Sequence, residues 1–108
     1  MSKIKQSFVF FKDAEDIGVS ENYLAINGNE SLIINLSGTG TCSVELQGKV
    51  DFNDVEWKTL GVINKKDFSI ATSMANNSVY TASVEGLYGV RVEIKSVSEK
   101  VTVFANLV

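Results

Sequence analysis

The sequence contains no histidine and no proline, and it has a single cysteine. Histidine is the commonest general base and the commonest transition-metal ligand, so its absence argues against triad-type catalysis and against most transition-metal sites. A lone Cys42 allows no disulfide within the chain, which excludes a disulfide-stapled secreted scaffold. We interpret Cys42 as a small buried strand residue. Together these absences predict a protein that is not an enzyme and needs no cofactor.

Basic runs and long apolar runs are also missing. The longest basic run is Lys65-Lys66, and the net charge of the 108 residues is −3, so we expect no nucleic acid as a partner. No stretch approaches the roughly 20 apolar residues of a membrane span, and the apolar run 8–11 is too short for the core of a signal peptide. We therefore expect one domain over residues 1–108 that is made in the cytoplasm without a signal peptide and has no membrane partner.

Apolar and polar residues alternate with a period of two along most of the chain, which is typical of half-buried β-strands. No window shows a convincing helical period, although residues 13–20 could hold one helical turn. The spacing predicts an all-β fold, an antiparallel β-sandwich or jelly roll of about eight strands. The segments with strand character are 4–11, 23–26, 31–37, 42–50, 55–63, 68–70, 80–84, 90–94 and 101–107.

The N-terminal segment carries more apolar surface than a terminus usually leaves exposed. Phe8 and Phe10 share one face of the first predicted strand, and Phe11 is out of phase with them. An exposed apolar patch commonly marks a contact with a partner. Because no proline protects the strand edges, charge or a neighbouring subunit must cover them. The hypothesis is that residues 1–22 form an N-terminal arm, and that Phe8, Phe10 and Phe11 are core or interface residues in a homo-oligomer.

The acidic segment that holds Asp51, Asn53 and Asp54 has two interpretations. Asp and Asn favour tight turns, so the first interpretation is a solvated hairpin turn between two strands. Carboxylate and amide oxygens are also the ligands that Ca²⁺ takes, which makes Asp51, Asn53 and Asp54 candidate calcium ligands. The spacing does not match an EF-hand loop. The turn is the main interpretation, and calcium is the alternative.

Aromatic residues could form a platform for sugars, because a flat ring offers an apolar face to a pyranose. The candidates are Trp57, which is the only tryptophan, together with Tyr23, Tyr80 and Tyr88, and we single out Trp57 and Tyr88 as ligand-binding residues. The polar neighbours on both sides of Trp57 favour a ring that points into the core, and a ligand surface is the alternative. Arg91 is the only arginine. It lies on the polar face of its strand with Glu93, which predicts a surface or interface ion pair.

Three segments in order resemble small virion proteins of tailed bacteriophages and prophages: 44–48 leading into 55–60, then 80–94, then 101–103. The family pattern G-L-x-x-V-R-V is matched by residues 86–92. Glu56 departs from the asparagine that usually precedes the tryptophan. The resemblance covers roughly residues 30–108. It implies a β-sandwich building block of a head fibre, tail appendage or baseplate, used in multiple copies and without catalytic residues.

Two functions are therefore expected. The first is a non-enzymatic structural or interaction subunit of a phage or prophage particle, which associates with itself and with other virion proteins through apolar faces or strand edges. The lack of a signal peptide fits this expectation, because virions assemble in the cytoplasm and leave by lysis. The alternative is a carbohydrate-binding module that takes a cell-surface glycan on exposed aromatic rings. The two could coincide in a receptor-binding appendage.

Overall fold

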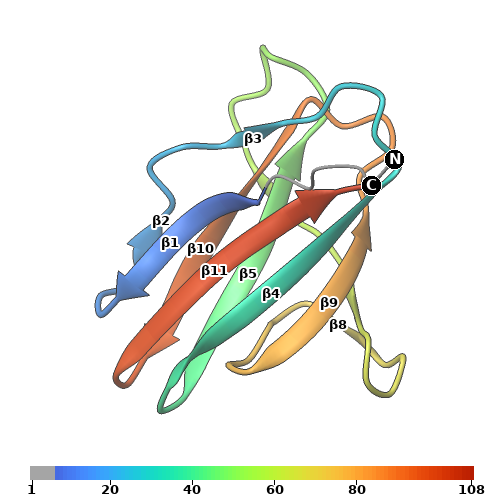
Figure 1. Ribbon diagram of the computed structural model, residues 1–108. Helices are drawn as coiled ribbons and strands as arrows, with labels where there is room; N and C mark the ends of the chain where they lie inside the picture. Colours follow the sequence, from blue (N-terminus) through green and yellow to red (C-terminus); the bar gives the residue numbers. More distant parts are fainter. Residues whose placement is uncertain (1–6) are drawn as a thin grey trace.

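The alternating pattern is realised as two antiparallel β-sheets that pack face to face (Figure 1). The computed structural model describes residues 7–108, and no helix occurs among them. The predicted all-β sandwich is confirmed. Its eleven strands are β1 (Phe8–Ala14), β2 (Gly18–Val19), β3 (Leu24–Ala25), β4 (Ser31–Thr39), β5 (Cys42–Lys49), β6 (Lys58–Thr59), β7 (Val62–Asn64), β8 (Ile70–Ala71), β9 (Ser78–Ser83), β10 (Gly89–Val97) and β11 (Lys100–Leu107).

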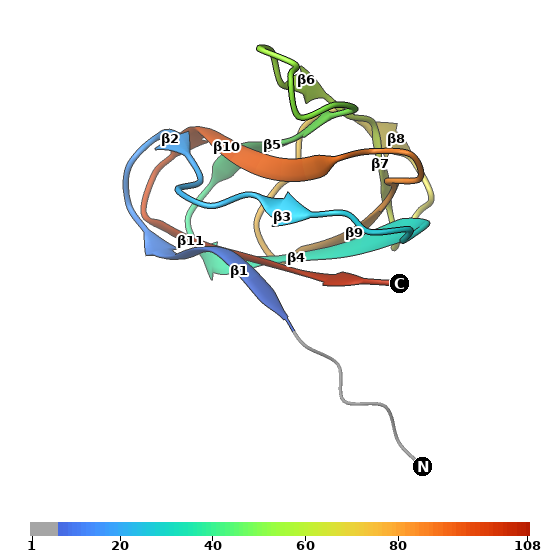
Figure 2. The same cartoon turned by 90° about the horizontal axis from the view of Figure 1, so that it is seen from above.

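Each sheet combines strands that are distant in the sequence. The first sheet has the order β1-β11-β4-β9-β7-β8, and the second has the order β2-β10-β5-β6, with β3 also paired to β10. Seen from above, β10 and β5 lie in one layer, and β1, β11 and β4 lie in the other (Figure 2). The β4–β5 and β10–β11 turns each connect one layer to the other. In the part of the chain that is described, no helix is long and apolar enough to cross a membrane.

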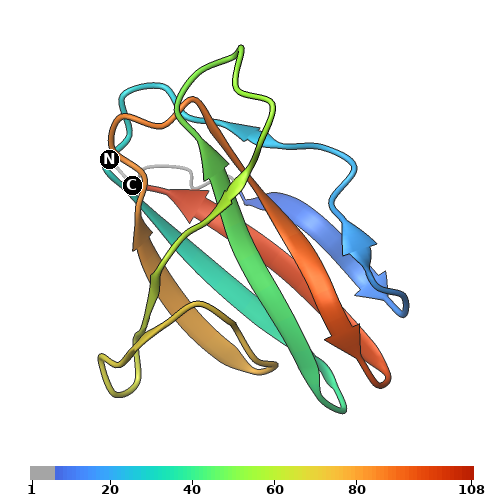
Figure 3. The same cartoon turned by 180° about the vertical axis from the view of Figure 1, so that it is seen from behind.

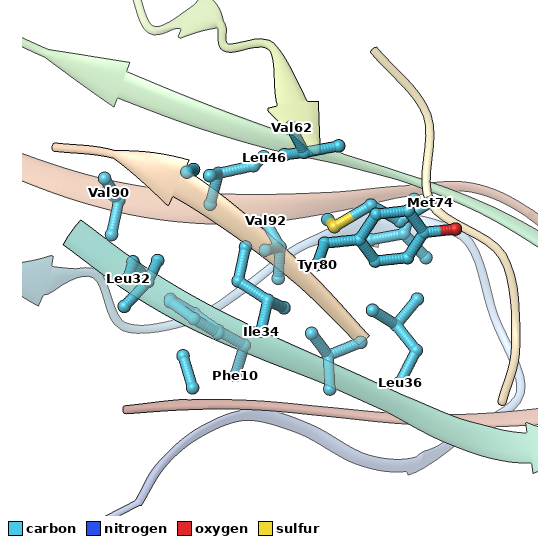
Figure 4. Packing of buried hydrophobic residues seen from close by; sticks show 14 of the residues in the cluster. Phe10, Leu32, Ile34, Leu36, Leu46, Val62, Met74, Tyr80, Val90 and Val92 are labelled. Atoms are coloured by element: carbon cyan, nitrogen blue, oxygen red, sulfur yellow. The ribbon is translucent and has the colours of Figure 1, made fainter. Parts of the chain in front are cut away.

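The core lies between the two layers and consists of the apolar positions of each alternation. On β4 the inward positions are Leu32, Ile34 and Leu36, all fully buried, and they face Leu46 and Val92 of the second sheet (Figure 4). Burial of such side chains is worth about 1.5–3 kcal/mol each. The buried cluster is Phe10, Leu32, Ile34, Leu36, Val44, Leu46, Val62, Met74, Tyr80, Ala82, Val84, Val90, Val92, Ile94, Val101, Val103 and Ala105.

Eleven strands are present rather than about eight, and nine of them correspond to the segments with strand character. The two additional strands are the short β2 and the second of the two strands that residues 55–63 form. The expected single strand over residues 55–63 is wrong. This segment divides into β6 of the second sheet and β7 of the first. Leu60 lies between these two strands, and its backbone N–H donates to the carbonyl of Leu46 at 2.8 Å. Residues 13–20 form no helical turn, since β1 continues to Ala14 and β2 follows.

Gly38 lies within β4, which continues beyond the predicted segment 31–37. A side-chain carbon at this position would collide with the backbone carbonyl of Lys100 on the neighbouring β11. The glycine therefore permits close approach of two backbones. The turn comes two residues later at Gly40, which has a φ of 74°. Nearby, the Asn76 side-chain amide donates to the carbonyls of Thr39, Gly40 and Lys100, which connects the β4–β5 turn to the start of β11.

The segment expected to be an N-terminal arm contributes to both sheets. β1 pairs with β11 and β2 pairs with β10, so residues 8–19 connect the two layers along one side. Residues 1–6 of the expected arm lie outside the described residues. Phe10 is only 7% exposed and belongs to the core, whereas Phe8 and Phe11 are half-buried against it. Of these three, only Phe8 and Phe11 have surface left to offer a partner.

Candidate functional site

The outer face of the second sheet carries the polar positions of β5 and β10. Gln47 on β5 is paired with Arg91 on β10, and Lys49 is paired with Gly89. Because side chains alternate between the faces of a strand, Lys49, Gln47 and Arg91 point away from the core. This face lies toward the viewer in Figure 3, where the loop after β5 extends beyond the ends of both strands. The loop, residues 50–57, brings Trp57 back to the sheet.

Four aromatic rings gather at this end of the face, and we call them the aromatic cluster: Tyr23, Phe52, Trp57 and Tyr88. The ring centroids of Tyr23 and Trp57 are 5.8 Å apart, those of Tyr23 and Tyr88 are 5.9 Å apart, and those of Phe52 and Tyr88 are 5.8 Å apart. These separations are typical of favourable tilted and edge-to-face aromatic pairs. The loop after β5, the residue before β10 and the residue before β3 therefore meet at this end of the face.

Gly89 makes room for one member of the aromatic cluster. A side-chain carbon on Gly89 would lie 2.7 Å from Cδ2 of Tyr23, so the ring of Tyr23 rests on the glycine backbone. The Tyr23 and Tyr88 hydroxyl oxygens are 3.2 Å apart and form a hydrogen bond. This hydrogen bond, with a smaller effect of burial, raises the pKa of Tyr88 above its ordinary value. The Tyr88 phenol therefore stays neutral well beyond physiological pH.

Two cations lie against the rings. The Lys49 ammonium is 4.9 Å from the centroid of Trp57, 5.6 Å from that of Tyr88 and 5.9 Å from that of Phe52. The Arg91 guanidinium is also 4.9 Å from the centroid of Trp57. Cation–π contacts at exposed sites contribute about 0.5–1 kcal/mol each. Trp57 is therefore held against the sheet by the two cations.

A polar network beside the rings orients Arg91. Its Nε donates to Oε1 of Gln47 at 2.8 Å, and Nε2 of Gln47 donates to Oε1 of Glu93 at 2.8 Å. Gln47 is only 6% exposed, so both of its hydrogen bonds satisfy a buried amide. The expected Arg91–Glu93 ion pair is wrong, because Gln47 lies between the two, and Glu93 forms its ion pair with Lys95 at 3.7 Å.

A pocket of about 470 Å³ lies where the loop leaves β5, and its lining residue Lys49 also contacts the aromatic cluster. The lining includes the apolar side chains of Leu60 and Leu87 and the charged side chains of Lys49, Lys58 and Glu56. Sites for small ligands commonly combine an apolar floor with a few polar groups at this size. Lys49 borders both the pocket and the aromatic cluster, so a bound molecule could contact the two together.

The acidic candidates form the turn in the loop. Oδ2 of Asp54 accepts the backbone N–H groups of Val50 and Asp51, both at 3.0 Å, and Oδ1 of Asp51 accepts the N–H of Asn53 at 2.9 Å. These are the side-chain-to-backbone bonds with which Asp stabilises turns. Across residues 7–108 no three His, Cys, Asp or Glu side chains are placed to hold a metal ion together. The calcium site at Asp51, Asn53 and Asp54 stays a prediction.

Of the sugar-binding candidates, Trp57, Tyr88 and Tyr23 meet in the aromatic cluster, whereas Tyr80 is buried in the core. Trp57 is half-buried but does not belong to the core cluster, so the expectation that its ring enters the core is wrong. The ring precedes β6 rather than sitting within a strand, and alternation therefore says nothing about its direction. Sequence reasoning missed Lys49 and Gln47, because only the register of β5 and β10 brings them beside Trp57.

A second missed feature lies at the edges of the first sheet. At one edge, Val9 on β1 is 53% exposed, and at the other, Phe68 and Ile70 around β8 are 73% and 79% exposed. Phe68 has a φ of 60°, which is unusual for a bulky residue. The hydrogen bond from its N–H to the carbonyl of Asn64, at 2.8 Å, closes the turn that presents the ring. Large exposed apolar side chains at sheet edges are candidate contact surfaces.

Comparisons with known proteins place these features in a family context. A family model described as XepA matches residues 4–105. The SPBc2 prophage-derived protein YomS has 27% sequence identity, and the match covers 99% of this chain and 96% of that chain with a TM-score of 0.85. The PBSX exported protein XepA shares the fold at 20% identity and a TM-score of 0.86, over 96% of this chain and 37% of that chain. No curated protein sequence matches this one.

Proposed function

Because the chain belongs to the XepA family, we propose that it is a non-enzymatic structural or interaction subunit of a phage or prophage particle. The relationship to a prophage-derived protein over 99% of the chain is the observation that carries this proposal. The resemblance of residues 44–60, 80–94 and 101–103 to small virion proteins supports it. The subunit associates with copies of itself and with other virion proteins, and it becomes a component of the virion.

Self-association through the strand edges of the first sheet is supported by the exposed side chains found there. The β1 edge offers Val9 with half-buried Phe8 and Phe11, and the β8 edge offers Phe68 and Ile70. A contact between the β1 edge of one copy and the β8 edge of the next uses two different surfaces. Such a heterologous contact produces a ring if the rotation closes and a filament if it does not.

The solution mass, measured by light scattering coupled to size exclusion, tests this contact. We expect a defined oligomer for the natural chain and a monomer for the double variant Phe68→Ser/Ile70→Ser. Val55→Ser is the matched control, because Val55 is 97% exposed on the loop after β5 and lies on neither edge. A natural chain that stays monomeric at every concentration refutes self-association. An oligomer that survives the double variant refutes the β8 edge as its contact.

Carbohydrate binding is the second candidate function, and the aromatic cluster favours it. Trp57 and Tyr88 come together with Tyr23 and Phe52 on an outer face rather than inside the core. A sugar ring that stacks there would change the surroundings of the single tryptophan. Titration of a glycan panel should therefore shift the fluorescence of Trp57 in the natural chain. No shift with any glycan would contradict this function and leave the structural proposal untouched.

A further inference from the structure

We propose that the outer face of the second sheet selects an acidic glycan, a sugar chain that carries carboxylate groups. Arg91 and Lys49 bind the carboxylates, and Trp57 stacks on a sugar ring. The inference rests on the second function above and deepens it by naming the class of sugar. It follows from the two cations that the structure places at the tryptophan and from the hydrogen bonds that orient one of them.

Lys49 presents a charge that is positioned but not neutralised. Its ammonium lies among the rings of Phe52, Trp57 and Tyr88, at 4.9–5.9 Å from their centroids. Aromatic faces attract a cation through their quadrupole and carry no net charge, so the full positive charge remains available. The ion pair found within residues 7–108 joins Lys95 to Glu93 and leaves Lys49 out. Because the rings already restrict the Lys49 side chain, less conformational entropy is lost when a ligand binds.

Arg91 is oriented for a planar carboxylate. Its Nε is occupied by Gln47, a buried amide that Glu93 fixes from the other side. No hydrogen bond engages its two terminal Nη groups within the described part of the chain. A guanidinium presents parallel donors that match the two oxygens of a carboxylate. Gln47 therefore acts as a positioning residue, and it holds Arg91 without neutralising it.

Two carboxylates beside this face are engaged in interactions of their own. Asp54 accepts two backbone N–H groups of its own loop, and Glu93 accepts from Gln47 and pairs with Lys95. Glu56 is the exception, because it is exposed and lines the pocket together with Lys58. The negative charge of Glu56 repels an anionic ligand, so Glu56 and the two cations should affect the affinity in opposite directions. Removing its charge should strengthen binding, whereas removing Lys49 or Arg91 should weaken it.

A glycan fits this surface better than a small anion does, because the cations converge on an aromatic ring. Both Lys49 and Arg91 lie 4.9 Å from the centroid of Trp57, so a carboxylate bound to them is carried by a group next to the indole. A pyranose has the apolar face that stacks on such a ring. The adjoining pocket of about 470 Å³ has room for the next part of the chain.

Fluorescence of Trp57 gives a direct assay, since it is the only tryptophan. The natural chain is titrated with an oligogalacturonate and with a neutral galacto-oligosaccharide of the same length. Inorganic phosphate and phosphatidylglycerol vesicles are titrated in parallel. We expect the acidic sugar to bind at least about tenfold more tightly than the neutral one, the equivalent of about 1.4 kcal/mol. Added salt should reduce this preference, because exposed charges are screened.

Variants assign the preference to the named side chains. Arg91→Gln and Lys49→Gln should each lower the affinity for oligogalacturonate about tenfold. Arg91→Lys should recover only part of the loss, because it restores the charge without the planar fork. Glu56→Gln should raise the affinity about twofold to threefold. Lys66→Gln is the matched control, since it removes one positive charge from the exposed turn between β7 and β8. Circular dichroism and melting curves verify that each variant is folded.

The outcomes separate this inference from the functions on which it depends. Equal binding of both sugars leaves carbohydrate binding intact and overturns the acidic preference. Binding of neither sugar overturns both. A response to inorganic phosphate as strong as that to oligogalacturonate reduces the site to a simple anion site, and binding to vesicles alone points to a lipid headgroup; either result overturns the glycan. The oligomeric state is measured separately, so the proposal of a particle subunit stands or fails independently.

Discussion

Substitution of Gly89 by alanine tests how the aromatic cluster is assembled. The new carbon would lie 2.7 Å from Cδ2 and 3.1 Å from Cε2 of Tyr23, and 3.3 Å from the carbonyl oxygen of Leu24. Carbon atoms do not approach one another as closely as the first of these distances, so the Tyr23 ring must move. Tyr23 is 42% exposed and can swing outward. The expected result is a displaced ring and an altered environment for Trp57.

The magnitude follows from two opposing effects on the free energy of unfolding. Overpacking at a well-packed contact costs about 1–3 kcal/mol, and the exposure of Tyr23 favours the lower part of this range. Replacing a strand glycine with alanine returns about 0.5–1 kcal/mol, because the unfolded chain loses conformational freedom. Gly89→Ala should therefore destabilise the protein by about 0.5–2 kcal/mol. The clash with Tyr23 outweighs the backbone effect, so the free energy of unfolding decreases.

A double-mutant cycle isolates the contact. Urea unfolding followed by Trp57 fluorescence gives the stability of the natural chain, Gly89→Ala, Tyr23→Ala and the double variant. In the Tyr23→Ala background the ring is gone, so Gly89→Ala should be neutral or stabilising, with the Leu24 carbonyl as the remaining close neighbour. The coupling energy should be about 1–2 kcal/mol, well above the error for independent sites. An equal cost of Gly89→Ala in both backgrounds would refute the packing of Tyr23 on Gly89.

Three further predictions concern the core, the acidic turn and the pH dependence. Ile34→Ala, at a fully buried position of β4, should destabilise the protein by about 2–5 kcal/mol in urea unfolding, because it leaves a cavity between the sheets. If Asp51 ligates calcium, millimolar Ca²⁺ should raise the melting temperature of the natural chain but not of Asp51→Ala, and identical curves would contradict the site. Hydrogen bonds from the Ser69 hydroxyl and N–H lower the pKa of Asp67 below its value in the unfolded chain, about 3.9. The native state therefore binds this proton less readily, the contribution to stability is lost as the pH falls below about 4, and acid titration of Asp67→Asn should show a shallower loss.

The strands with a long alternation could be predicted from the sequence, whereas the short β2 and the division of residues 55–63 could not. Residues 31–37 and 101–107 alternate over several positions, and the structure extends them only slightly as β4 and β11. Residues 55–63 contain apolar residues at strand-like intervals and yet divide between two sheets. Their alternation is interrupted where the chain crosses from one layer to the other, and hydrogen bonds to β5 and β9 rather than local preference decide where it crosses.

The candidate site could also be predicted only in part from the sequence. Trp57 and Tyr88 could be chosen from the sequence because aromatic rings carry recognisable chemistry. The direction of the Trp57 ring could not be predicted, since its polar neighbours suggested burial, whereas contacts with Lys49 and Arg91 hold it on the outer face. The exposure of Phe68 at the β8 edge could not be predicted from the sequence. Its positive φ and the turn it closes are properties of the folded backbone.

The sequence by itself determined that the chain forms an antiparallel sandwich, which residues face its core, and that histidine chemistry is absent. Those properties depend on local alternation and on composition, and both can be read directly from the amino-acid sequence. Only the tertiary structure decided that Tyr23, Lys49, Trp57, Tyr88 and Arg91 meet. These residues are far apart in sequence, and their meeting depends on the register of β10 with its neighbours and on how the loop after β5 folds back. A shift of one residue in that register would turn Arg91 into the core, and no alternation in the sequence encodes which pairing the folded chain adopts.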